Sequence, residues 1–231
     1  MNYAVILSGG VGSRMGNKDL PKQYMLAQGK PVLVYTLEQF EACPEVDEII
    51  VVANPKWADQ IWNWAKEYGI TKLTKIAEPG PTRQESLLNG MLCCAGNEDN
   101  DVVLIHDAAR PLVSVDLISR CVAALPGYDA VLPVLEMKDT IYQSVDGQVV
   151  SGLAERSILF CGQSPEVFYL KKYLQLNLQA TQQELESTRG GCEIAFRNGL
   201  KVGMILGEDY NFKLTTPADI DRLMIYLNRT K

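Results

Sequence analysis

The sequence predicts an α/β fold: a Rossmann-like, mostly parallel twisted sheet with helices on both faces, plus a protruding β-hairpin arm. Two observations predict this fold. Short, wholly apolar runs, which are typical of buried parallel strands, alternate with segments of helical spacing from the first residues onward. Glycine-rich or polar segments follow several of the apolar runs. At 231 residues, we expect one domain spanning residues 1–231.

The first elements follow one another closely. Residues 3–7 form an apolar run that ends in glycines, as expected of a first buried strand. Residues 32–40 have apolar side chains on one helical face. Residues 48–53 (EIIVVA) are predicted to be the second strand, and residues 55–68 a helix that carries three tryptophans.

The alternation continues through the middle of the chain. Residues 70–76 are the expected third strand, followed by a helix over 84–95. Residues 101–105 (DVVLI) are predicted to be a fourth, buried strand, followed by a helix over 115–125 and a further strand at 130–134. In sheets of this kind, ligands bind beyond the carboxyl ends of the strands. The polar segments after the first, third and fourth strands should therefore meet there.

The pattern changes at residues 138–157, where two short β-prone runs are separated by VDG. This indicates a hairpin, and we interpret 138–157 as an arm that packs against a partner subunit. A helical stretch then continues to about residue 186, a late strand is expected at 202–206, and a helix over 216–227 closes the chain.

Composition excludes several classes of protein. The net charge of −6 and the pI of about 5.0 disfavour binding to nucleic acid. No run approaches the roughly 18 apolar residues that cross a membrane, and the start of the chain does not resemble a secretory signal. The six cysteines form no CxxC pair, which favours reduced thiols in the cytoplasm. One histidine, His106, excludes a zinc site built on several histidines.

The strongest local signal is a glycine loop at residues 7–16 (LSGGVGSRMG), followed by PKQY at 21–24. Glycines there allow backbone N–H groups to approach a phosphate. The spacing is neither the dinucleotide fingerprint nor Walker A. Arg14 and Lys22 add two cations, which suit a triphosphate whose α-phosphorus is attacked. The alternative is a turn that starts a helix, with two solvated cations.

A second signal is the segment HDAARP, in which Asp107 stands just beyond a buried strand. A carboxylate there is placed to bind Mg²⁺, which takes one or two carboxylates plus substrate phosphates. The alternative role for Asp107 is a helix cap. His106 could act as a base, but an acceptor phosphate is already a good nucleophile near neutral pH. We therefore favour a packed, supporting histidine.

Together with KDT and NFKLT, these strings resemble the cytidylyltransferases that activate polyol phosphates, from residue 3 to about residue 220. One branch makes CDP-methylerythritol for isoprenoid synthesis, and the other makes CDP-ribitol for teichoic acids and capsules. The resemblance implies a Mg²⁺-dependent enzyme that transfers CMP from CTP to a polyol phosphate and releases pyrophosphate. With the arm, it also implies a homodimer. From the composition we expect a cytoplasmic protein with no nucleic-acid or membrane partner.

The resemblance also implies the residues of the site. The residues implied to bind CTP are Ser8, Gly9, Gly10, Gly12, Pro81, Arg83 and Ser86. The catalytic cations would be Arg14, Lys22 and Lys213. The acceptor would be held by Arg110, Thr140 and Arg156, with the last reaching across from the neighbouring subunit. Asp107 would hold the metal.

The chain departs from the isoprenoid branch in three places. Tyr210 stands directly before Asn211, with Asp209 one residue further away. Residues 163–166 read QSPE in place of QTPQ, and the TDxA segment of that branch is replaced around residues 190–193. The spacing before PKQ also leans toward the ribitol branch, although HDAARP is the isoprenoid form. We therefore favour ribitol 5-phosphate, with methylerythritol 4-phosphate as the alternative. A transferase using UTP or ATP on a sugar 1-phosphate and a non-catalytic CTP-binding regulator are the rival interpretations.

Overall fold

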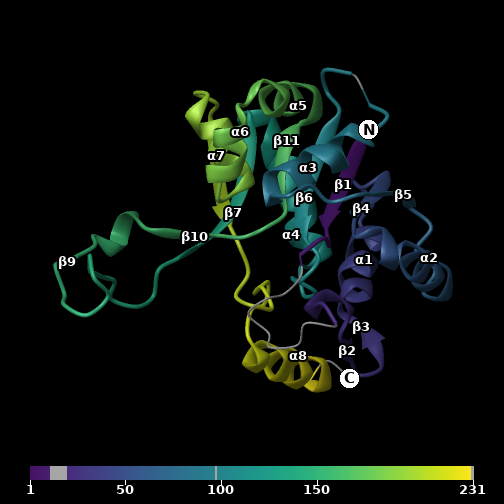
Figure 1. Ribbon diagram of the computed structural model, residues 1–231, viewed down its shortest axis with the longest axis horizontal. Helices are drawn as coiled ribbons and strands as arrows, with labels where there is room; N and C mark the ends of the chain where they lie inside the picture. The colour runs from purple at the N-terminus through teal and green to yellow at the C-terminus, as the bar shows by residue number, and fades with distance from the viewer. Residues whose placement is uncertain (11–19, 97, 230–231) are drawn as a thin grey trace.

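The computed structural model describes residues 1–10, 20–96 and 98–229. Its main sheet has the strand order β10-β7-β11-β6-β1-β4-β5, and β12 also pairs with β7 (Figure 1). The predicted fold class is confirmed: the sheet is mixed but mostly parallel, with helices on both faces. The strands of this sheet are β1 (Asn2–Leu7), β4 (Glu48–Val52), β5 (Leu73–Ala77), β6 (Val102–Asp107), β7 (Ala130–Glu136), β10 (Phe160–Gly162), β11 (Glu166–Tyr169) and β12 (Val202–Leu206).

The parallel part of the sheet is centred on β1, which pairs in parallel with both β4 and β6. The register sets Leu7 opposite Val52 on one side and opposite Asp107 on the other. The three strands therefore end level with one another. The segments that follow them meet at the same edge of the sheet, as expected for ligand binding in open α/β sheets.

Alternate residues of β1 enter two different cores. Ala4 and Ile6 pack with helices α1 (Val32–Ala42), α2 (Ala58–Glu67) and α4 (Val115–Ala124). On the other face, Tyr3 and Val5 pack with a second set of helices. That set is α3 (Arg83–Leu92), α5 (Leu170–Gln179), α6 (Gln182–Ser187) and α7 (Gly191–Arg197). Both faces of the sheet are therefore covered (Figure 1).

Several boundaries differ from the sequence prediction. The helix expected over 55–68 begins as a 3₁₀ turn, η3 (Pro55–Trp57), before α2. The helical stretch expected to about residue 186 is divided into α5 and α6, because Thr181 and Glu184 form a capping box that starts a new helix. Short 3₁₀ turns also occur at η2 (Lys22–Tyr24), η4 (Leu125–Gly127) and η5 (Arg156–Ile158).

Strand β11 was not predicted as part of the sheet. It lies between β6 and β7 and is antiparallel to both. Its four residues are too short to show a period, and α5 follows without a break. Its strand conformation depends on pairing with distant strands, so it could not be recognised locally.

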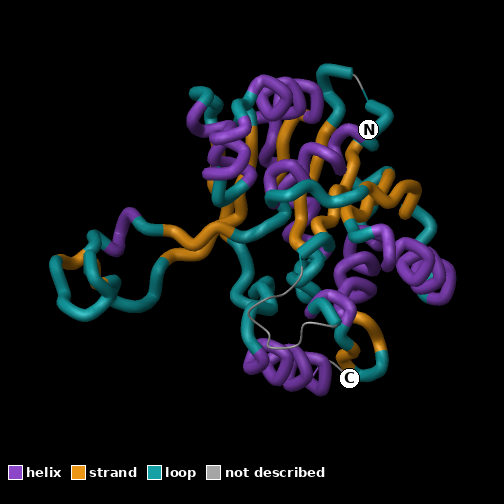
Figure 2. The backbone as a smooth tube through the Cα atoms, in the orientation of Figure 1, coloured by secondary structure: helices purple, strands orange, loops and turns teal. Residues whose placement is uncertain are grey.

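Residues 138–157 leave the sheet between β7 and β10, and Figure 2 shows them extending away from the rest of the molecule. Within this arm, β8 (Tyr142–Gln143) and β9 (Gly152–Leu153) pair antiparallel, as predicted for a hairpin. Several apolar side chains of the arm are exposed: Tyr142, Val145, Val149, Val150 and Leu153.

The last helix, α8 (Pro217–Arg229), packs against a small hairpin of β2 (Leu26–Ala27) and β3 (Lys30–Pro31). Buried Leu214 and Leu223 join the two. The segment between β12 and α8, residues 207–216, which we call the late loop, is tied to the end of β6 by a hydrogen bond from Leu214 N–H to Ala109 O. All six cysteines are free thiols, and none of the helices described is both long and apolar enough to cross a membrane.

Candidate active site

A cavity of about 580 Å³ opens at the carboxyl ends of β1, β5 and β6. The glycine loop, the segment before α3, the end of β6 and the late loop all contribute to its wall, so the predicted convergence of polar segments is found here. Its lining residues are Leu7, Gly9, Gly10, Lys22, Gln23, Asn54, Pro79, Gly80, Pro81, Thr82, Arg83, Ser86, Asp107, Ala108, Ala109, Lys213 and Thr215.

The first residues of the glycine loop, 8–10, are held in place by the Gln23 side chain. Its amide donates to the carbonyl oxygens of Ser8 (2.7 Å) and Gly10 (2.9 Å). The Ser8 hydroxyl is buried and bonds to Tyr24, so this side chain supports the loop from beneath. A Cβ on Gly9 would lie 2.5 Å from Cβ of Pro79, so only glycine allows this approach. Gly12 and Arg14 lie outside the described residues.

Pro81, Arg83 and Ser86 line the cavity from the start of α3. The helix begins with a capping box between Thr82 and Glu85. The Ser86 hydroxyl donates to Thr82 O (2.8 Å) and accepts from Gly80 N–H (3.1 Å). These hydrogen bonds fix side-chain and backbone groups of this segment relative to one another.

Asp107 is the centre of the charged part of the site. Lys213 Nζ lies 3.0 Å from its Oδ2, Arg110 Nε lies 3.4 Å from the same oxygen, and Arg83 Nε lies 3.7 Å from Oδ1. Burial acts to raise the pKa of Asp107, but Lys213, Arg83 and Arg110 outweigh it and hold that pKa well below its usual value. Asp107 is therefore a carboxylate at physiological pH.

Lys22 and Lys213 line the cavity together. Lys22 Nζ also donates to Leu214 O at 2.5 Å. This bond attaches Lys22 to the late loop at the residue next to Lys213. Two predicted catalytic cations thus come from opposite ends of the chain. Ammonium groups so placed can neutralise charge on a phosphate.

His106 is completely buried, and burial lowers its pKa to about 3, so it is neutral. Its Nε2 lies 3.2 Å from Arg110 O and therefore carries the proton, while Nδ1 accepts from the Ser164 hydroxyl at 2.9 Å. The Ser164 oxygen in turn accepts from Asp107 N–H. His106 thus holds the turn that bears Asp107 and Arg110, the supporting role favoured from the sequence.

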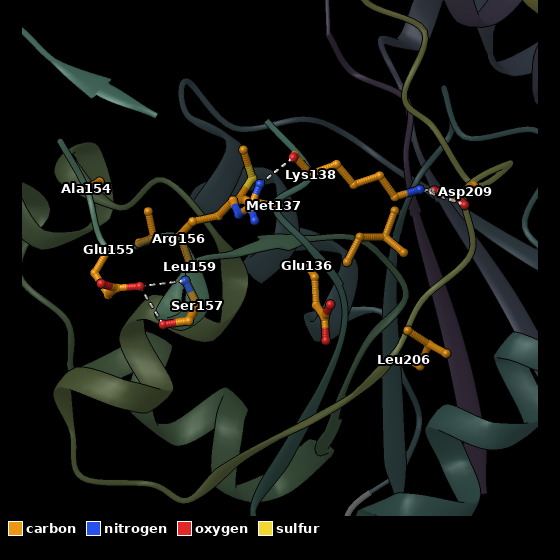
Figure 3. A pocket seen from close by; sticks show the side chains of 11 residues that line it. Glu136, Met137, Lys138, Ala154, Glu155, Arg156, Ser157, Leu159, Leu206 and Asp209 are labelled. Carbon is orange, nitrogen blue, oxygen red and sulfur yellow. Dashed lines mark hydrogen bonds and ion pairs between the residues drawn. The ribbon is translucent and has the colours of Figure 1, made fainter. Parts of the chain in front are cut away.

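The predicted acceptor residues are divided between two places. Arg110 bonds to Asp107 and to Asn211 O. Thr140 is exposed on the arm, and Arg156 stands near the root of the arm, where its Nη1 donates to Lys138 O (Figure 3). Lys138 pairs with Asp209 of the late loop at 2.8 Å. Arg156, Lys138 and Asp209 line a second hollow of about 940 Å³.

Sequence reasoning assigned no role to Gln23, Ser164, Glu166 or Asn211, although all four are buried at the site. Asn211 donates to Ser164 O, which joins the late loop to the segment before β11. The only local signal was their presence in the strings PKQY, QSPE and NFK. Their partners lie far away in the chain, so the contacts could not be inferred locally.

Among the described residues that line the cavity, Asp107 is the one carboxylate that could bind a divalent metal. No group of three or more His, Cys, Asp or Glu side chains gathers within the described residues. Asp107 is ionised and lines the cavity. These features fit Mg²⁺ in its usual nucleotide sites, where one or two carboxylates share the ion with phosphate oxygens and water.

A glycine loop after β1, cations from two loops and a carboxylate at the end of β6 define a phosphate-binding α/β enzyme. The model of the 2-C-methyl-D-erythritol 4-phosphate cytidylyltransferase family matches residues 2–229. The chain belongs to this family. It is a cytidylyltransferase that acts on a polyol phosphate, as predicted.

Individual relatives agree with this assignment. The chain is 34% identical over 223 residues to the ribitol-5-phosphate cytidylyltransferase of Lactiplantibacillus plantarum, with 95% of each chain covered. It resembles the structure of 4-diphosphocytidyl-2C-methyl-D-erythritol synthase from Anaerococcus prevotii with a TM-score of 0.82 and 27% identity, over 98% of this chain and 96% of that one. The Francisella tularensis 2-C-methyl-D-erythritol 4-phosphate cytidylyltransferase shares the fold, with a TM-score of 0.81 and 24% identity, over 100% and 99% of the two chains.

Proposed function

We propose that this enzyme transfers CMP from CTP to ribitol 5-phosphate, giving CDP-ribitol and pyrophosphate. The observation that carries the choice of acceptor is the 34% identity to a ribitol-5-phosphate cytidylyltransferase over 95% of both chains. Methylerythritol 4-phosphate is the second candidate, because the family whose model matches this chain is named for that acceptor.

In the proposed reaction, CTP lies in the 580 Å³ cavity with its base beside the start of α3 and its phosphates beside the cations. An oxygen of the acceptor phosphate attacks the α-phosphorus of CTP. The bond from that phosphorus to the bridging oxygen breaks, and pyrophosphate leaves with the electron pair. Lys22 and Lys213, with Arg14, neutralise the growing negative charge. Positioning and electrostatics supply the catalysis.

We further propose that Mg²⁺ is the cofactor and that Asp107 holds it. When bound, the ion would neutralise phosphate charge and align the triphosphate. Lys213 and Arg110, which pair with the Asp107 carboxylate, can also bind phosphate oxygens of the nucleotide.

The acceptor phosphate is proposed to bind Arg110, Thr140 and Arg156, since guanidinium groups suit a phosphate dianion. The exposed apolar side chains of the arm support a homodimer, in which Arg156 of the partner subunit completes the site. We propose a cytoplasmic location, supported by six free thiols. The net charge of −6 supports small phosphorylated partners rather than nucleic acid or an anionic membrane.

The test is pyrophosphate release with Mg²⁺ and CTP, measured in parallel with ribitol 5-phosphate, methylerythritol 4-phosphate and no acceptor. Release with ribitol 5-phosphate alone is expected. Release with methylerythritol 4-phosphate alone would assign the enzyme to the isoprenoid branch. A preference for UTP over CTP in the same assay would contradict the proposed site for the base.

A further inference from the structure

Glu166 is a second buried carboxylate at the edge of the active site. It begins β11 and is 5% exposed. Its register partner on β6 is Ile105, two residues before Asp107. The two carboxylates therefore stand near the ends of neighbouring strands. A glutamate this deeply buried requires partners for its charge.

One oxygen of Glu166 is held by the protein scaffold. Oε2 accepts a hydrogen bond of 2.6 Å from Cys192 N–H in the first turn of α7. A Cβ on Gly191 would lie 2.7 Å from the same oxygen, so a larger residue there would require the Glu166 carboxylate to shift. The hydrogen bond from Cys192 N–H fixes one oxygen of the carboxylate to the backbone of α7.

The other oxygen holds Arg83. Glu166 Oε1 accepts from Arg83 Nη2 at 3.0 Å, whereas Arg83 Nε lies 3.7 Å from Asp107 Oδ1. Arg83 is therefore shared between two carboxylates and stands closer to Glu166. With Lys213 and Arg110, the described cluster contains three cations and two anions, one positive charge in excess.

We propose that Glu166 is a positioning residue of the transfer reaction. By holding Arg83, it prevents this guanidinium from closing onto Asp107, and so keeps the Asp107 carboxylate available to the metal–nucleotide complex. This inference rests on the proposed function, because it takes Asp107 as the ligand of Mg²⁺.

The first experiment compares Glu166→Gln with the wild-type enzyme in two measurements. The proposal predicts that the apparent affinity for Mg²⁺ falls while the affinity for CTP rises. The Mg²⁺ concentration for half-maximal turnover should rise several-fold, because Arg83 then pairs with Asp107. CTP affinity measured calorimetrically without Mg²⁺ should become about two- to five-fold tighter, since the cluster gains one net positive charge. A merely structural role predicts weaker CTP binding and a lower melting temperature, and that result would overturn the proposal.

Two further variants serve as controls. Glu193→Gln removes a carboxylate from α7, the helix whose backbone bonds to Glu166. Glu193 pairs with Arg197, and its replacement should change neither measurement. Glu166→Asp keeps the charge with a shorter side chain, and should return the Mg²⁺ requirement toward the wild-type value. It also supplies a folded variant if Glu166→Gln is unstable.

The final step asks whether Glu166 acts through Arg83. In an Arg83→Met background, adding Glu166→Gln should leave the Mg²⁺ requirement unchanged, because the residue it positions is gone. Independent, additive effects would refute the inference while leaving the enzyme's function intact. Failure of the wild-type enzyme to release pyrophosphate with any polyol phosphate would instead refute the proposed function.

Discussion

Nζ of Lys213 lies 3.0 Å from Oδ2 of Asp107, so an ion pair joins the late loop to the carboxyl end of β6. These residues are 106 positions apart in the chain. Their contact brings a cation and the proposed metal ligand together on one wall of the cavity.

Replacing Lys213 with methionine should lower turnover about 100-fold, the usual cost of losing one donor that stabilises transition-state charge. The stem of the side chain keeps much of its packing, whereas the ammonium is lost. Steady-state kinetics with CTP and the acceptor would measure the effect. Lys171→Met removes a surface lysine paired with Asp99 and serves as the control, which should retain full activity.

Replacing Lys22 with alanine should lower turnover far more than CTP affinity, because its charge is needed most when the α-phosphorus is attacked. Turnover at saturating substrate and CTP binding by calorimetry would be compared. If CTP affinity fell while saturated turnover held, Lys22 would be a binding residue instead. Its bond to Leu214 O predicts some loss of order in the late loop as well.

Stability should fall as the pH drops below about 6.5, partly because of His106. Burial lowers the pKa of His106 to about 3 in the folded protein, and an unfolded histidine titrates near 6.5. Between these values the unfolded chain binds a proton that the native protein excludes. As the pH falls below 6.5, the contribution of neutral His106 to the free energy of unfolding therefore decreases, at a rate approaching about 1.4 kcal/mol per pH unit.

Urea unfolding at pH 7.5, 6.5 and 5.5 would measure this slope for the wild-type protein and for His106→Gln. The variant should be less stable at pH 7.5 but should lose stability more slowly on acidification. The two slopes should differ by the equivalent of close to one bound proton. Parallel slopes for the two proteins would show that His106 does not titrate as described. Asp107 adds little in this range, since its pKa is lowered and an unfolded aspartate protonates only near pH 4.

Arg156→Ala should raise the KM for the acceptor while leaving CTP affinity unchanged, because Arg156 lies at the root of the arm, away from the residues that line the CTP cavity.

If the arm acts across a dimer, mixing Arg156→Ala with Lys22→Ala under subunit exchange should restore about a quarter of wild-type activity. This is because half of the dimers would be mixed, and each mixed dimer has one intact site. No recovery in verified mixed dimers would place Arg156 in the site of its own chain.

Local sequence was enough for the elements whose residues carry their own signal. The apolar runs at β1, β4 and β6 are buried between helices, and such strands contain few polar residues. The boundaries of β12 were also predicted correctly, at Val202–Leu206. By contrast, β11 and α7 were missed because short elements show no clear period.

The sequence by itself determined the α/β class, the glycine loop and the cytidylyltransferase family, because these depend on residue types at close spacing. The tertiary structure alone decided which distant charges share Asp107, why His106 is neutral and that Glu166 holds Arg83. Those relationships depend on burial and on contacts between residues far apart in the chain. Spacing along a chain does not encode the distances on which electrostatic interactions depend.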